Sequence, residues 1–412
     1  MHFLNRLNSE KTTRLFSGPY LAFGPPDWGL SDLMRAFLYS LTRKNYIENL
    51  ETILKEVLGP SSVMVTNLGR TALKIGLKAI GLKEGAGVVL PTVICSTVIR
   101  AVLEAGCRPI LVDVEKTLHV SVSTLNSCKS ERTHAVIVPH LYGLHAPIQE
   151  IKGWAKSKGL YLIDDAAQAV GISVNGSYLG TFGDFGILSF GPFKSLGTPR
   201  GGALISDHNE IIGCAKKNIL ERESFYWVIR RVLSGIIKFH WRPYYLRIYE
   251  ILSHGKKKAS GSYNGVGQNR IANEAFQLSN LEAQLVLAVM ERTVSIIARR
   301  RKNAKEIWNL LKQFDKFEFV GPHDAPYTKI PIRLHGGLAA EEAIRLFRSM
   351  GVEAERIYRP LHLHKEYKVY ASKPLPVAEE NWEKVFLIPN LGTEGLVGMK
   401  RLEQAFKALS KV

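Results

Sequence analysis

The sequence predicts an α/β protein in which a mixed, mostly parallel sheet lies between layers of helices. Between residues 45 and 206, short apolar segments of strand length alternate with amphipathic segments of helical spacing, such as 69–80 and 149–158. This alternation is typical of a parallel sheet that helices cover on both faces. Sheets of this class bind ligands at the carboxyl ends of their strands. We therefore expect a large ligand-binding α/β domain over residues 1–213.

Three predicted strands of this domain end beside residues that can do chemistry. Residues 161–163 lead into Asp165, the strand over residues 185–190 precedes Lys194, and a third strand runs into a helix that begins near Gly69. Helix N-termini favour phosphate through their N–H groups and dipole. Pyridoxal phosphate (PLP) needs a lysine amine that holds it as a Schiff base and a carboxylate that keeps its pyridine nitrogen protonated. The three segments together predict a PLP enzyme.

Each of these segments has a simpler interpretation when it is taken alone. Asp164 and Asp165 could cap a following helix, and Lys194 could be an ordinary solvated loop lysine. The combination of both segments with the glycine-containing helix start favours the cofactor site.

With these motifs, the chain resembles the DegT/StrS family of PLP-dependent sugar aminotransferases from about residue 23 to its C-terminus. The resemblance rests on Leu68-Gly-Arg-Thr-Ala-Leu, Asp164-Asp-Ala-Ala-Gln and Ser189-Phe-Gly-Pro-Phe-Lys, with two glycines following at residues 201–202. It implies a fold-type I enzyme and a homodimer with active sites near the subunit interface. The implied reaction converts a keto group on a nucleotide-linked sugar into an amine, with glutamate as the amino donor, in surface polysaccharide or amino-sugar biosynthesis.

The resemblance also implies a role for each matched residue near the cofactor. Lys194 would bind PLP covalently, Asp165 would contact the pyridinium nitrogen, and Gln168 would hydrogen-bond the phenolic oxygen or lie against the ring. The phosphate would be held by the Ser189 side chain and by a helix start composed of Gly69, Arg70 and Thr71. Arg70 replaces the commoner threonine of the family, and its guanidinium could add a charge-assisted phosphate contact. The alternative for Arg70 is a surface arginine at a helix start.

Two histidines are candidate substrate-binding residues. His140 lies in Val138-Pro-His-Leu-Tyr-Gly, and His362 lies in Tyr358-Arg-Pro-Leu-His, which matches the family's Tyr-x-x-Pro-Leu-His signature. A purely structural role is the alternative for each. We predict no metal site, because the four cysteines follow no metal or disulfide spacing.

Three positions depart from the family pattern. Cys95 stands where many relatives place an aromatic residue against the cofactor ring, and a thiol has no aromatic face. Arg200 replaces a common glutamate before the paired glycines, and Ala275 replaces an asparagine that often reaches the neighbouring subunit's cofactor phosphate.

Two alternatives to the aminotransferase therefore stay open. One is a PLP-dependent sugar dehydratase, which Lys194 disfavours because such relatives typically carry histidine there. The other is a PLP-fold regulatory or membrane-associated protein without turnover.

Composition agrees with a large cytoplasmic enzyme. The chain has 412 residues, of which 46% are hydrophobic, enough to bury a sizeable core. The N-terminus lacks the apolar core of a signal peptide, and no apolar stretch reaches the ~20 residues that a membrane span needs.

Residues 214–262 form a basic, aromatic-rich insertion. They hold eleven Lys and Arg against three Glu, and Pro243 is expected to break the segment into two helices. Basic residues mixed with aromatic ones suit a peripheral helical hairpin on an anionic membrane, at the inner face of the membrane. The main alternative is an insertion that packs on a second subunit or on the small domain. Nucleic acid ranks third, because no recognised nucleic-acid module accompanies the basic residues.

Residues 263–412 are expected to form a long helix and a small C-terminal α+β domain. Apolar spacing predicts the helix over residues 276–311. A strand over 329–334, a helix over 339–350 and a strand over 352–357 then make up the small domain.

Overall fold

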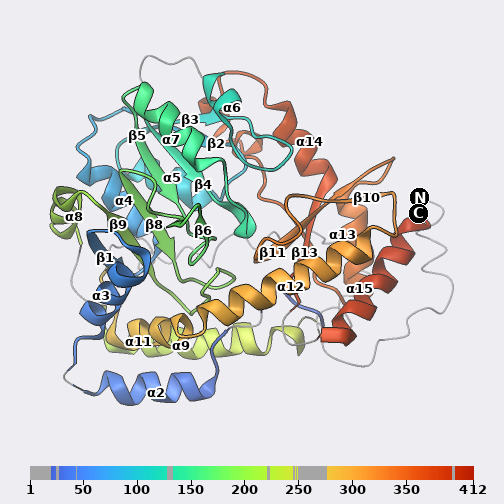
Figure 1. Cartoon of the computed structure of the whole chain (residues 1–412), viewed down its shortest axis with the longest axis horizontal. Coiled ribbons are helices and arrows are strands. Elements are labelled where there is room, and N and C mark those ends of the chain that lie inside the picture. The colour runs from blue at the N-terminus through green and yellow to red at the C-terminus, as the bar shows by residue number, and fades with distance from the viewer. Residues whose placement is uncertain are drawn as a thin grey trace.

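The centre of the protein is a seven-stranded sheet (Figure 1). The computed structural model describes residues 20–412 except 25–26, 43, 128–132, 220–222, 245, 247, 249–275 and 392–394. The strands are β1 (Ser62–Thr66), β2 (Gly87–Pro91), β3 (Arg108–Val112), β4 (Thr133–Pro139), β5 (Tyr161–Asp165), β8 (Phe185–Ser189) and β9 (Gly202–Ser206). Their order is β1-β9-β8-β5-β4-β2-β3. Only β9 pairs antiparallel with its neighbours, so the predicted mixed, mostly parallel sheet is confirmed.

Helices cover both faces of this sheet, and each face has its own apolar core. One face packs against α3 (Tyr46–Leu58), α7 (Ile148–Ser157) and α11 (Asn280–Met290), and the other packs against α4 (Gly69–Ala79), α5 (Ser96–Glu104) and α8 (Asn209–Lys216). Side chains alternate between the faces along a strand. In β4, Val136 and Val138 therefore enter the first core, while Ala135 and Ile137 enter the second. A short helix, α6 (Val122–Asn126), and a hairpin of β6 (Ser173–Val174) and β7 (Ser177–Tyr178) complete this region.

The expected single helix over residues 276–311 is wrong. The structure has two helices there, α11 and α12 (Thr293–Leu311). A capping box of Ser279 and Glu282 starts α11, and Arg292 lies between the helices, where its guanidinium donates hydrogen bonds to Asp32. Nearly every residue of α11 is buried, whereas α12 carries a basic surface and runs on to the small domain (Figure 1). The break lets the chain change direction between these two environments.

The small domain is a four-stranded antiparallel sheet with helices. Its order is β10-β11-β13-β12, formed by β10 (Phe317–Phe319), β11 (Lys329–Leu334), β12 (Glu355–Arg356) and β13 (Val385–Pro389). The helices are α13 (Ala340–Ser349), α14 (Pro376–Lys384) and α15 (Gly395–Ser410), with 3-10 turns η3 (Leu361–Leu363) and η4 (Lys368–Tyr370). The predicted strand at 329–334 and helix at 339–350 are confirmed. The strand predicted at 352–357 shrinks to β12, because Val352 instead bridges to Leu21 of the N-terminal segment.

Part of the basic insertion forms α9 (Phe225–His240), and residues 242–244 are helical again after a break at Trp241. This agrees with the expected interruption near Pro243. Val228 and Val232 of α9 are buried in the core of the large domain. One face of α9 therefore packs on the large domain, whereas the alternative interpretation of the insertion expected contact with a second subunit or with the small domain. Among the described residues, no helix is both long and apolar enough to cross a membrane.

Candidate active site

The site lies at the edge of the sheet where β1, β5 and β8 end. Their directions agree, because β5 is parallel to β8 while β1 and β8 both pair antiparallel with β9. The segments after these strands are packed in contact. A Cβ atom placed on Gly69 would lie 3.0 Å from the Ser189 Cβ, and one on Gly202 would lie 2.4 Å from the Gly69 nitrogen. Only glycine permits this approach of the α4 start to the end of β8.

This close approach creates a cradle at the N-terminus of α4. The Ser189 hydroxyl lies beside Gly69 and is nearly buried. The Thr71 hydroxyl donates a hydrogen bond of 2.7 Å to Asn67 Oδ1, so the Thr71 side chain fixes the loop and only its backbone faces an incoming group. Backbone N–H groups and the positive end of a helix dipole suit a phosphate. The expected phosphate residues are therefore brought together.

Arg70 lies at the side of this cradle. With Lys74 and Arg100 it lines a small cavity between α4 and α5. Burial lowers the pKa of Arg70, while the Glu104 carboxylate opposes that shift. The Arg70 side chain is half-buried. It is therefore neither a fully solvated surface arginine nor a fully buried structural arginine.

The two adjacent aspartates at the end of β5 have different environments. Asp164 is fully buried, and its carboxylate accepts hydrogen bonds from the backbone N–H groups of Gly180 (2.7 Å) and Phe182 (3.0 Å). Asp165 accepts one hydrogen bond, of 3.0 Å, from the Ala167 N–H. Burial raises the pKa of Asp165, and the positive charge of Lys194 acts against that increase. The turns that follow Asp165 overturn the helix-cap alternative.

His140 makes hydrogen bonds to both aspartates of this pair. Its Nδ1 accepts a hydrogen bond of 3.1 Å from the Ala146 N–H, so its Nε2 carries the proton and donates it to Asp164 at 2.7 Å. Its backbone N–H donates to the Asp165 carbonyl. Both ring nitrogens are used inside the protein. This geometry supports the structural alternative for His140 and leaves no ring nitrogen for a substrate.

Gln168 is held between two tyrosines. Its Oε1 accepts a hydrogen bond of 3.1 Å from the Tyr142 N–H, and its Nε2 donates one of 3.1 Å to the Tyr358 hydroxyl. The two tyrosine rings stack at 5.8 Å, and the Gln168 carbonyl accepts a hydrogen bond from the Ser195 hydroxyl. This ties the loop of Lys194 to Gln168. Sequence reasoning had not singled out either tyrosine, although both lie within motifs that it quoted.

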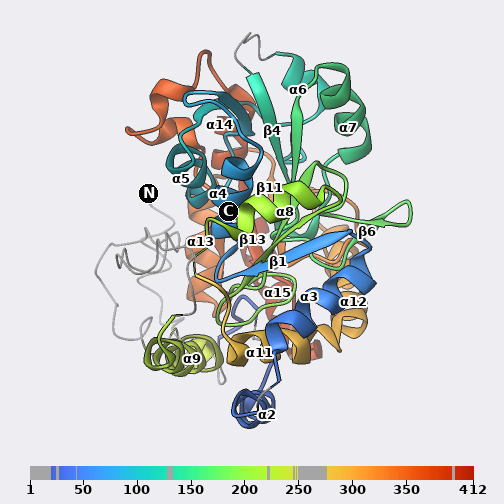
Figure 2. The ribbon, with the colours of Figure 1, turned by 90° about the vertical axis from the view of Figure 1, so that its left-hand side faces the viewer.

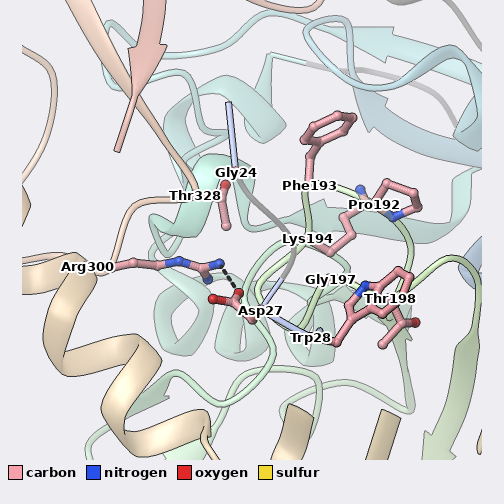
Figure 3. Close-up of a pocket in the computed structure, with 10 residues that line it drawn as sticks. All are labelled: Gly24, Asp27, Trp28, Pro192, Phe193, Lys194, Gly197, Thr198, Arg300 and Thr328. Carbon is pink, nitrogen blue, oxygen red and sulfur yellow. Dashed lines mark hydrogen bonds and ion pairs between the residues drawn. The ribbon is translucent and has the colours of Figure 1, made fainter. Parts of the chain in front are cut away.

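Lys194 lies in a pocket whose walls come from three distant parts of the chain (Figure 3). Asp27 comes from the N-terminal segment, Arg300 from α12, and Phe193 from the loop itself. Phe193 has a positive φ of 62°, a conformation that few residues other than glycine adopt. Burial lowers the pKa of Lys194, while Cys95 and Asp165 act in the opposite direction.

An ion pair closes one side of this pocket. Arg300 lies 3.1 Å from Asp27 and donates a hydrogen bond of 2.8 Å to the Ser195 carbonyl. Arg300 has basic neighbours on both sides in the sequence, and no local signal separates it from them. Its role depends on the N-terminal segment, which is distant in sequence.

Cys95 and His362 lie outside the lining of the Lys194 pocket. Cys95 is the residue at which α5 begins, and its thiol lies 3.1 Å from the Thr97 hydroxyl and contributes to the electrostatic environment of Lys194. His362 Nδ1 lies 2.8 Å from the Thr92 hydroxyl, and its Nε2 lies 3.1 Å from the Glu379 carboxylate. His362 therefore connects the loop before Cys95 to the small domain, and it does not line the Lys194 pocket.

Arg200 belongs to a buried chain of alternating charges. It pairs with Glu223 at 2.5 Å, Glu223 pairs with Arg231 of α9 at 2.6 Å, and Arg231 pairs with Glu282 of α11 at 2.9 Å. The two positive and two negative side chains compensate one another. The replacement of the usual glutamate by Arg200 is thus matched by an acid from the insertion, and it links the insertion to the glycine pair that packs on Gly69.

Known proteins carry the same fold. Residues 32–394 match the DegT/DnrJ/EryC1/StrS aminotransferase family. Helicobacter pylori PseC, an aminotransferase involved in the biosynthesis of pseudoaminic acid, aligns over 95% of this chain and 99% of its own with a TM-score of 0.76 at 18% identity. NtdA from Bacillus subtilis, solved with bound PMP, aligns over 98% of this chain and 87% of its own with a TM-score of 0.72 at 22% identity.

Curated relatives are similar in sequence as well. The chain is 26% identical to GDP-perosamine synthase of Escherichia coli O157:H7 over 363 residues, which cover 86% of this chain and 88% of that protein. It is 34% identical over 176 residues to the 3-oxo-glucose-6-phosphate:glutamate aminotransferase of Bacillus subtilis, a match that covers 42% of this chain and 38% of that protein. The chain therefore belongs to the DegT/DnrJ/EryC1/StrS aminotransferase family and has the fold-type I architecture that its motifs indicated.

Proposed function

We propose that this PLP-dependent aminotransferase acts on a keto sugar linked to a nucleotide, with Lys194 as the residue that binds the cofactor. The observation that carries the proposal is the meeting of three unlike groups at one sheet edge. These are the desolvated Lys194 amine, the buried Asp165 carboxylate and the phosphate cradle at Gly69 and Ser189. A PLP molecule carries an aldehyde, a pyridine nitrogen and a phosphate, so it presents one complementary group to each of them.

The residues fit the cofactor chemically as well as in position. When bound, PLP supplies a ring that accepts electrons while an amino group is exchanged. Because the pKa of Lys194 is lowered, its Nζ is neutral more of the time than that of a surface lysine, and it can attack the cofactor or move a proton beside it. Asp165 supplies the negative charge that holds a proton on the ring nitrogen. Gln168 and Ser195 hold the loop in register.

The substrate class is inferred from the relatives. One is named for a GDP-linked sugar, and another is named for a 3-oxo sugar phosphate with glutamate. We propose glutamate as amino donor and amino-sugar or surface polysaccharide biosynthesis as the setting. The intact set of Lys194, Asp165 and Ser189 favours turnover over a dehydratase or a scaffold without activity.

An absorbance experiment tests this proposal. The purified protein should develop the visible band of lysine-bound PLP, and glutamate should bleach it in a half-reaction. A nucleotide-linked keto sugar should then restore the band. Stable PLP binding without bleaching by any amino donor would contradict the aminotransferase and favour the scaffold.

We also propose a homodimer, on the strength of the family resemblance. Ala275, which replaces an expected contact to the neighbouring subunit, lies outside the described residues. Sedimentation at micromolar concentration should give a dimer, and a monomer with full activity would contradict this proposal.

Finally, we propose that the insertion brings the enzyme to an anionic membrane from the cytoplasmic side without spanning it. The support is the excess of basic residues in 214–262 together with the outward face of α9, where Tyr226, Arg230 and Leu233 are exposed. Residues 249–262 of the insertion lie outside the described part of the chain. Binding to vesicles that increases with anionic lipid and decreases with salt is the expected result.

A further inference from the structure

Helix α2 (Leu30–Ser40) shows an apolar stripe to solvent. Leu30, Met34, Leu38 and Leu41 recur at intervals of three or four residues, which places them along one side of a helix, and they are 68, 59, 62 and 66% exposed. Phe37 extends the stripe and is 41% exposed. A solvated helix normally turns its polar side outward. The apolar side chains of this stripe are therefore left uncovered by the described part of the chain.

The opposite side of α2 turns its acidic residue toward the protein. Asp32 is nearly buried, and its carboxylate accepts hydrogen bonds from the Gly29 N–H and from Arg292 at 2.9 Å. Ala36, one turn further on, is fully buried. These contacts fix the rotation of α2 about its axis. The outward position of the apolar stripe is thus a consequence of specific packing.

Helix α9 and the residues after it expose a second apolar face. Tyr226 and Leu233 are 64 and 53% exposed, and the face continues through Trp241, Tyr244 and Ile248 at 63, 55 and 57%. Burial of Val228 and Val232 on the opposite side fixes this orientation. The face is rich in aromatic residues, which favour the boundary between water and lipid.

The two faces are close in the folded protein. Both helices lie at the same end of the molecule, lengthwise in Figure 1 and end-on in Figure 2, so their axes are nearly parallel. The His240 ring at the end of α9 meets the Trp28 ring before α2 at 4.8 Å. Of the 20 large hydrophobic residues found exposed in the described part of the chain, 12 belong to α2, α9 and their adjoining residues. Such clustering marks an interaction surface.

Charge decides which partner fits this surface. The sequence of α9 contains Arg230, Arg231 and Lys238 and no acidic residue, and the acid of α2, Asp32, faces inward. Arg231 is paired with Glu223 and Glu282, whereas Arg230 is exposed on this face. In a symmetric contact between two copies, each patch meets itself, so the exposed Arg230 side chains would oppose one another. An anionic lipid surface complements them instead, and each nearby basic residue adds to the attraction.

We propose that α2 and α9 together form a lipid-binding face, in which the apolar stripe of α2 inserts among the headgroups of an anionic bilayer. The inference rests on the proposed membrane contact of the insertion and adds α2, a helix nearly 200 residues earlier in the chain, as its second element. Two helices that lie parallel to a surface bury their apolar sides at the interface without crossing it. The residues that line the Lys194 pocket belong to neither α2 nor α9, although one of them, Trp28, contacts His240 of α9.

Vesicle flotation of the full-length holoenzyme tests each helix separately. Vesicles of phosphatidylcholine, with and without one part in three of phosphatidylglycerol, are compared at low and high salt. The α2 variant is Met34→Gln with Leu38→Gln, the α9 variant is Tyr226→Gln with Leu233→Gln, and the control is Leu103→Gln with Val369→Gln, two exposed residues elsewhere. We expect binding to anionic vesicles to fall about tenfold in each helix variant, because two apolar side chains no longer bury part of their surface in the lipid. Binding of the control variant should be unchanged.

The outcomes separate the two proposals. Loss of binding in the α9 variant with normal binding in the α2 variant would overturn the role of α2 and leave the insertion as the membrane contact. Absence of binding by the unchanged protein would overturn both. If the unchanged protein instead forms an assembly in solution that the α2 variant dissolves, the stripe is a contact between copies and the lipid assignment is wrong.

Discussion

The sheet edge around Lys194 and the outer face of α2 and α9 use polar and apolar groups in opposite ways. At the sheet edge, polar side chains are buried, and Asp164 has specific hydrogen-bond partners in His140, Gly180 and Phe182. On the outer face, apolar side chains are exposed while Asp32 and Arg231 are paired toward the protein. Burying charge requires compensating partners, and exposing apolar surface is unfavourable without a partner. Each region thus contains an arrangement that is unfavourable in water and that its proposed ligand would stabilise. The ligand is PLP at the sheet edge and lipid at the outer face.

The largest expected effect is on the buried chain of charges behind the site. Glu223→Ala would leave the buried Arg200 without the carboxylate that it pairs with, while Arg231 would keep Glu282. Removing one member of a buried ion pair costs about 3–5 kcal/mol. Denaturant unfolding should show this loss, with weaker PLP binding because Arg200 precedes the glycines packed on Gly69. As a control, Glu210→Ala removes a glutamate whose side chain is 74% exposed. Equal stability of the two variants would contradict the structural role of the chain.

Asp165→Asn should mainly affect chemistry. Without the negative charge the ring nitrogen of bound PLP loses its proton, and removal of one preorganised charge typically lowers a rate by about 100-fold or more. Stopped-flow absorbance with glutamate measures the half-reaction. Retention of PLP with a slow half-reaction is expected, whereas an unchanged rate would remove Asp165 from the mechanism.

Asp164→Asn should mainly affect stability. An amide cannot accept hydrogen bonds from His140, Gly180 and Phe182 together, and a buried group left without its partner costs about 1–3 kcal/mol. Thermal unfolding measures this change, and the half-reaction of the folded variant should be faster than that of Asp165→Asn. If the two variants behaved in the reverse order, the register of the aspartate pair would be wrong by one residue.

The smallest effect is expected on the outer face. Met34→Gln with Leu38→Gln replaces side chains that touch mainly water, so the free energy of unfolding should change by about 0.5 kcal/mol or less. Calorimetry without lipid checks this. A loss of several kcal/mol would show that the stripe supports the fold, which would remove the contrast with the sheet edge.

The same contrast explains which features could be predicted from sequence. Lys194, Asp165 and Ser189 lie in local motifs next to strand ends, and the chemistry of the cofactor restricts their identity, so their convergence followed from topology. Arg300 and Asp27 are more than 270 residues apart in the sequence, and neither local sequence predicts that they form an ion pair. Periodicity likewise could not reveal the break at Arg292, because apolar spacing continues across it. The outward rotation of α2 depends on the contact of Asp32 with Arg292, which only the folded chain shows.

The central claim is that Lys194 binds the cofactor, and borohydride trapping tests it most directly. The protein is incubated with PLP, reduced, digested and mapped, with Lys194→Arg as the negative variant and Lys329→Arg as a matched control, since Lys329 is also near Phe193. We expect a single PLP-labelled peptide that contains Lys194, is absent from Lys194→Arg and is retained in Lys329→Arg. A label on another lysine, or no label with PLP in excess, would contradict it.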